Sequence, residues 1–114
     1  MELIELNDLI DSAVYEFCCA VYYNDLENRS HWNANSLFVK WEEFGVLAPY
    51  LDMVFPHYHY FGPQKIRLLE WEKVKELYFA SNNQHTLMSN FFVGIDQWLA
   101  KENNSAEYFW ILGV

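Results

Sequence analysis

The chain has 114 residues, 53% of them hydrophobic and 20% charged, which is enough for one well-supplied core and excludes a disordered chain. Sixteen acidic residues against seven basic ones give a formal net charge of −9, which argues against a protein that grips nucleic-acid phosphates. We expect a single domain over residues 1–114 in the cytoplasm, because the sequence shows neither a secretory signal pattern nor an apolar run long enough for a membrane span.

Residues 7–24 carry apolar and polar side chains at spacings of three and four, which predicts one helix with a buried and an exposed face. Asn7 is a suitable N-cap, and acidic residues in the first turn suit the helix dipole. The apolar side is expected to face the core. The exposed side then presents acids and tyrosines together: Asp8, Asp11, Ser12, Tyr15, Glu16, Cys19, Tyr22 and Tyr23.

Two adjacent cysteines fall within this segment. Neighbouring side chains on a helix diverge by roughly 100°, so Cys18 and Cys19 are expected to remain reduced thiols. Cys18 is expected to fill the core, and Cys19 to be the more exposed thiol.

A second helix is expected to begin near Asn35 or Ser36 and to be limited by Pro49. Residues 49–63 contain all three prolines and five aromatic residues, which predicts a loop or a short extended chain. Within it, the His57-Tyr58-His59 sequence would place two imidazoles on one side of an extended segment. Two ligands do not make a metal site, and the possible third ligands are His31, His85 and Asp52.

In the second half of the chain, the sequence pattern predicts two longer helices and an apolar tail. Pro63 suits the first turn of a third helix, with the alternative that residues 66–71 form a strand before a shorter helix. Thr86 can cap a fourth helix that ends near Lys101. The tail over residues 108–114 is apolar and β-prone, so it should dock in the core or pair as a strand.

These elements predict a mainly α fold, a single compact domain of about four helices with an apolar C-terminal segment. The alternative is an α+β fold with a small sheet formed by the N- and C-terminal segments.

No catalytic motif is present, so we expect a protein that is not an enzyme and needs no cofactor. The charge is concentrated instead: residues 1–28 hold seven acids and no base. Carboxylates interleaved with tyrosines are typical of a surface that meets a basic partner. Aromatic residues on the proline-bounded loop are second-rank interface anchors.

Three strings give the chain a general likeness to a known class of protein. They are residues 6–10 (LNDLI), residues 91–99 (FFVGIDQWL) and residues 109–113 (FWILG). Together with small size and acidity, they resemble bacterial immunity proteins, in particular those of contact-dependent growth inhibition systems. The resemblance implies a basic nuclease-type toxin domain as the partner, with carboxylates standing in for substrate phosphates.

The sequence therefore predicts an immunity protein that neutralises a basic toxin domain. The alternatives are an acidic adaptor that binds another basic protein and a small-ligand or metal-binding domain that uses the His57–His59 loop. A homodimer closed by the tyrosine face is a further possibility. The residues expected to contact the partner are Asp8, Asp11, Tyr15, Glu16, Tyr22, Tyr23, Asp25, Glu27, Tyr58 and Tyr60.

Overall fold

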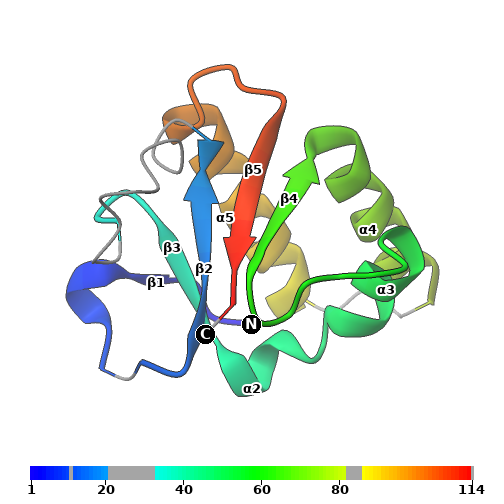
Figure 1. The fold of residues 1–114 in the computed structure, drawn as a ribbon, viewed down its shortest axis with the longest axis horizontal. Helices are drawn as coiled ribbons and strands as arrows, with labels where there is room; N and C mark the ends of the chain where they lie inside the picture. Colours follow the sequence, from blue (N-terminus) through cyan, green and yellow to red (C-terminus); the bar gives the residue numbers. More distant parts are fainter. Residues whose placement is uncertain (11, 21–32, 82–85, 114) are drawn as a thin grey trace.

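A computed structural model describes residues 1–10, 12–20, 33–81 and 86–113, and it is an α+β fold built on a five-stranded sheet (Figure 1). The strand order is β1-β3-β2-β5-β4, and all four pairings are antiparallel. In chain order the elements are β1 (Ile4–Glu5), the 3-10 turn η1 (Leu6–Asp8), β2 (Val14–Cys19), β3 (Leu37–Lys40), α2 (Trp41–Phe44), α3 (Ala48–Val54), β4 (Pro63–Arg67), α4 (Leu68–Ser81), α5 (Thr86–Glu102) and β5 (Tyr108–Leu112).

The core lies between one face of the sheet and the helices. In Figure 1, α5 runs behind β2 and β5, and α4 lies beside β4. The registers place Phe17 of β2 opposite Leu37 of β3 and Ile111 of β5. Side chains alternate between the two faces of a strand, so these residues share the helix-covered face. Fully buried aromatic rings fill this layer: Phe17, Phe44, Trp71, Phe91 and Phe109.

The mainly helical fold predicted from the sequence is wrong, and the first helix accounts for much of the error. Residues 14–19 form the central strand β2, and all six side chains are buried. A strand covered on both faces shows no alternation of polar and apolar residues, so the pattern gave no strand signal. The α+β alternative gave the right fold class but the wrong sheet: within the described residues the sheet has five strands, and the terminal strands β1 and β5 are not neighbours.

Two further segments were predicted as helix but begin as strands. β3 and the short α2 replace the start of the second helix, and Pro49 lies in the first turn of α3 instead of ending a helix. Pro63 opens β4 rather than a third helix, and α4 follows at Leu68. Proline is tolerated at the first residue of an edge strand because its missing N–H is not needed there.

The last two elements agree with the sequence. The fourth helix is confirmed as α5, with Phe91, Ile95 and Trp98 buried against the core. The apolar tail does pair as a strand: β5 lies between β2 and β4, with Phe109 and Ile111 buried. None of the helices in the described ranges is long and apolar enough to cross a membrane.

Candidate protein-binding surface

The ten residues predicted to contact a partner were expected on the first helix and its exit and on the proline-bounded loop, but Tyr15 and Glu16 lie in the strand β2. Asp11, Tyr22, Tyr23, Asp25 and Glu27 lie outside the described residues. Of the other five, Asp8 is exposed at the end of η1, Tyr60 is half-buried, and the remaining three are buried: Tyr15, Glu16 and Tyr58. Those three are not available to a partner in this structure. Tyr15 and Glu16 lie in the buried strand β2 instead of on an exposed helix, and the loop residue Tyr58 packs against other aromatic rings.

Tyr15, Tyr58 and Tyr60 do come together, but they do so inside the molecule. The Tyr15 ring stacks on Phe44 at 3.9 Å between centroids, and the Tyr58 ring lies 4.5 Å from that of Tyr60. The Tyr60 hydroxyl donates a hydrogen bond of 2.7 Å to the Asp52 carboxylate. Burial is the main reason that the pKa of each of these three hydroxyls is raised. The cluster therefore stabilises the packing between the sheet and α3.

Glu16 has a structural role on the opposite face of β2. Its Oε2 accepts hydrogen bonds from the Ser36 hydroxyl at 2.6 Å and from the Asn33 backbone N–H at 3.2 Å. Hydrogen bonds offset part of the cost of burying a carboxylate. Glu16 therefore holds the turn that leads into β3, a role that its position in the sequence did not indicate.

Both cysteine thiols are buried, so the prediction that Cys19 is the more exposed of the two is wrong. Burial, together with the neighbouring Cys18 and Glu102, raises the pKa of the Cys19 thiol to about 12. A thiol held neutral in this way is a poor nucleophile.

The free edge of β4 is poorly suited to adding a further strand. On the side of β5, the Gly113 N–H bonds to Gly62 O and the Leu68 N–H bonds to Glu107 O. In an antiparallel pair the hydrogen-bonding direction alternates, so the backbone groups of residues 63, 65 and 67 point away from β5, toward the free edge. Pro63 has no N–H, and the Arg67 N–H is taken by the Glu70 carboxylate at 2.9 Å. Such devices protect edge strands from pairing with other chains. A partner is therefore expected to bind a face or an end of the sheet.

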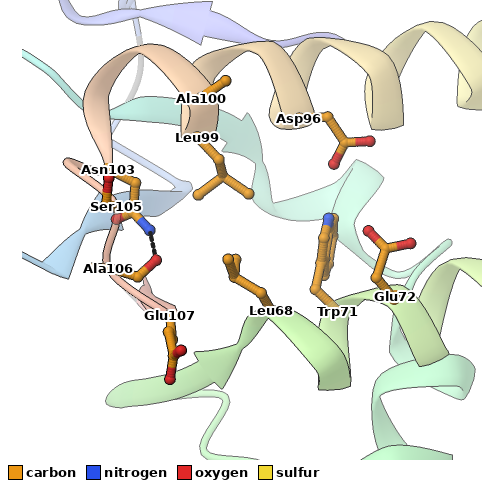
Figure 2. A pocket seen from close by; sticks show the side chains of 10 residues that line it. All are labelled: Leu68, Trp71, Glu72, Asp96, Leu99, Ala100, Asn103, Ser105, Ala106 and Glu107. Carbon is orange, nitrogen blue, oxygen red and sulfur yellow. Dashed lines mark hydrogen bonds between the residues drawn. The ribbon is translucent and has the colours of Figure 1, made fainter.

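A hollow of about 410 Å³ lies between α4, α5 and the loop before β5 (Figure 2). Figure 2 shows Glu72 and Asp96 facing one another at one side of it and Asn103 at the other. Lys75 binds both carboxylates, at 2.7 Å and 2.8 Å, so their charges are partly neutralised. Lys75 of α4 thus joins this helix to α5 through Asp96, and Ser105 and Glu107 also line the hollow.

The histidines of the 55–62 segment do not form a metal site with the described residues. His57 and His59 are both exposed. Within the described ranges, no group of three or more His, Cys, Asp or Glu side chains is placed to hold a metal ion. His31 and His85 lie outside those ranges.

A different acidic surface forms where the N-terminal segment meets α2. The Glu2 backbone N–H donates to the Glu43 carboxylate at 3.1 Å, and the Trp41 N–H donates to Ala13 O at 2.9 Å. These bonds bring residues some thirty to forty positions apart together at α2, which lies at the bottom of Figure 1. We define the N-terminal acidic surface as Glu2, Asp8, Ile10, Trp41, Glu42 and Glu43.

Its apolar part is a slot of about 350 Å³ lined by Ile10, Ala13, Lys40, Trp41 and Glu42. Ile10 is fully exposed, and Trp41 is 52% exposed. A side-chain hydrogen bond joins Trp41 to the Tyr15 hydroxyl, with the indole N–H as its donor. The ring is thus held in place while much of it faces water.

Of the residues on the N-terminal acidic surface, only Asp8 was among those that the sequence predicted to contact a partner. The available signal in the sequence is weak: a tryptophan and two glutamates directly follow three apolar residues and one lysine.

Comparison of the chain with protein-family models, curated proteins and solved structures finds no match.

Proposed function

We propose that this protein binds a basic protein partner through the N-terminal acidic surface and that it acts as an immunity protein, neutralising a nuclease-type toxin domain. The observation that carries the proposal is the uneven placement of charge. Residues 1–62 contain ten acidic and two basic side chains, whereas residues 63–114 contain six and five. The acidic excess therefore belongs almost wholly to the half of the chain that builds this surface.

Ion pairing sharpens the contrast between the two halves. In the second half, Lys75 bridges Glu72 and Asp96, and two weaker exposed pairs join Lys73 to Glu76 and Lys101 to Glu102. Among the described residues, the carboxylates of Asp8 and Glu42 take part in no ion pair, and the same is true of Glu107 in the second half. Unpaired carboxylates beside exposed apolar side chains are typical of a surface that meets a cationic partner.

A nuclease is a fitting partner because its active-site cleft must attract a polyanion. Opposite charges at two such surfaces accelerate encounter, toward about 10⁸ M⁻¹s⁻¹ at low salt, and suppress unsuitable partners. Attraction between exposed charges is screened beyond about 10 Å at 0.1 M salt. Complex formation should therefore be fast and sensitive to ionic strength. The general resemblance to immunity proteins supports this kind of partner over an unrelated basic protein.

The test is an untagged pull-down from the native host at low salt, eluted with a salt gradient and identified by mass spectrometry. We expect one basic nuclease-like domain, released only at high salt. The recovered partner is then measured against Asp8→Lys/Glu42→Lys and against a control of equal charge change on the other half, Glu76→Lys/Glu107→Lys.

The first variant should slow association at least tenfold at low salt and flatten its salt dependence, while the control should have a much smaller effect. Equal losses in both variants would mean that only net charge matters. If neither variant changes association, the surface assignment is wrong. Recovery of a basic partner with no nuclease character would favour the adaptor alternative.

A further inference from the structure

The slot between Ile10 and Trp41 exposes large apolar side chains to water, which attraction between charges does not explain. A fully exposed isoleucine and a half-exposed tryptophan share a hollow of about 350 Å³ at the protein surface. Large apolar side chains that face a common hollow and have a polar rim are characteristic of interaction sites. The slot is therefore a better candidate for an anchoring point than the isolated exposed residues elsewhere, such as Val93 on α5.

The tryptophan is held in advance of binding. Its backbone N–H is bonded to Ala13 O, and its indole N–H is bonded to Tyr15, whose own ring is stacked on Phe44. A side chain fixed from both ends loses little conformational freedom when a ligand packs against it. Contacts with core residues thus fix the Trp41 ring in the slot before a ligand binds.

Charged side chains of both signs line the rim of the slot, Glu42 and Lys40. Glu42 belongs to this lining, and the next residue of α2, Glu43, is half-buried and accepts a hydrogen bond from the Glu2 N–H. Lys40 is one of only two basic residues among residues 1–62, which contain ten acidic ones. An arginine side chain matches both parts of this arrangement, because its guanidinium group stacks on an indole and pairs with a carboxylate, while its aliphatic stem covers apolar surface.

We propose that the Ile10–Trp41 slot receives an arginine side chain of the basic partner. This inference rests on the proposed function and names the contact that the partner makes. Arginine suits the slot better than lysine because the planar guanidinium is more weakly hydrated and offers several donors in one plane.

The slot can be tested with peptides before any partner is known. The probes are an acetylated nine-residue Gly-Ser peptide with three arginines and matched peptides with three citrullines or three leucines. Each is titrated at 50 mM salt into the ¹⁵N-labelled chain, and the Trp41 indole and Ile10 amide resonances are followed by NMR. The arginine peptide should shift both resonances, and the citrulline and leucine peptides should leave them in place.

Variants then locate the contact. Ile10→Ser and Glu42→Gln should each raise the Kd of the arginine peptide about 2- to 5-fold, the range expected for an exposed cation–π or ion-pair contact. Val93→Ser is the matched control, since Val93 is 52% exposed but lies on α5, and it should leave the Kd unchanged. Ile10 is fully exposed, so its substitution tests the slot without endangering the fold.

Several results would overturn the proposal. These are equal shifts from the leucine or citrulline peptides, an unchanged Kd in both slot variants, or self-association of the chain that Ile10→Ser abolishes. The peptide result is separable from the proposed function. If a host toxin binds and depends on Asp8 but not on Ile10 or Trp41, the slot assignment fails and the function stands. If the arginine peptide binds but the host yields no basic partner, the slot stands and the function fails.

Discussion

Asn103 connects three parts of the fold that are distant in sequence. Its side chain is only 2% exposed at the end of α5. The amide oxygen accepts the Ala20 N–H at 3.2 Å, just beyond the end of β2, and the amide nitrogen donates to Ala106 O at 3.1 Å and to Tyr108 O at 3.0 Å. The first of the two donated bonds is drawn in Figure 2. Asn103→Ala should therefore loosen the contact between α5 and the strands β2 and β5.

The expected loss can be worked from these three contacts. A hydrogen bond contributes about 1 kcal/mol net, so losing three costs about 3 kcal/mol, before any penalty for the buried groups left unpaired. Unfolding entropy of about 2.1 cal/mol/K per residue gives about 0.24 kcal/mol/K for a chain of this length. The melting temperature should consequently fall by about 12 °C. Domains of this size have stabilities of about 5–15 kcal/mol, so the variant should remain folded at 25 °C.

Urea denaturation followed by circular dichroism measures this loss directly. Asn90→Ala, an exposed substitution on the same helix, is the control and should change stability by less than about 0.5 kcal/mol. Asn103→Asp keeps the acceptor for Ala20 but directs a carboxylate at two carbonyl oxygens, so its pKa is expected to be raised. A raised carboxyl pKa stabilises the fold only at low pH, so this variant should lose stability as pH rises through about 4.

The reasoning would be refuted if Asn103→Ala matched the Asn90 control, since the three contacts would then contribute nothing measurable. It would also be refuted if Asn103→Asp were as stable as the parent chain at pH 7. Either result would mean that the end of α5 is held by packing alone.

The remaining predictions concern the C-terminal strand, the buried thiol and the buried acid. A Cβ at Gly113 would overlap the carbonyl oxygen of Tyr60, so Gly113→Ala should cost about 1–3 kcal/mol in urea denaturation, whereas Gly62→Ala, which meets nothing within 4 Å, should be nearly neutral. The pKa of the Cys19 thiol is raised from 9.0 to about 12, so its contribution to stability is complete below pH 9 and is lost at up to about 1.4 kcal/mol per pH unit above it. Denaturation curves from pH 8 to 11 check this, and Cys19→Ala should reduce the slope; an unchanged slope would contradict the assignment. Glu16→Ala should destabilise the fold by about 2–4 kcal/mol because it leaves two donors without their acceptor. A melting temperature equal to that of the parent chain would show that the carboxylate has no structural role.

The C-terminal half of the fold was largely predictable because its information is local. α5 carries buried residues at helical spacing over 17 positions, and β5 alternates buried and partly buried residues over five. Periodicities of this kind arise when an element has one face in the core and one toward water. The elements that were mispredicted, β2 above all, lack that asymmetry, since every side chain of β2 is buried.

The acidic character of the first half, the reduced state expected of the cysteines and the absence of a catalytic motif follow from the sequence alone, because composition needs no coordinates. Only the tertiary structure decided which acids reach the surface. Glu16 is bonded inside the protein to Ser36, a residue twenty positions away, whereas Glu42 lines a slot with Ile10 and Trp41 and has no ion pair within the described part of the chain. The candidate surface is created by strand pairing and by the bond between Glu2 and Glu43, which lie far apart in the chain. Burial depends on residues that are distant in the sequence, and a local sequence pattern does not indicate which distant residues will be in contact.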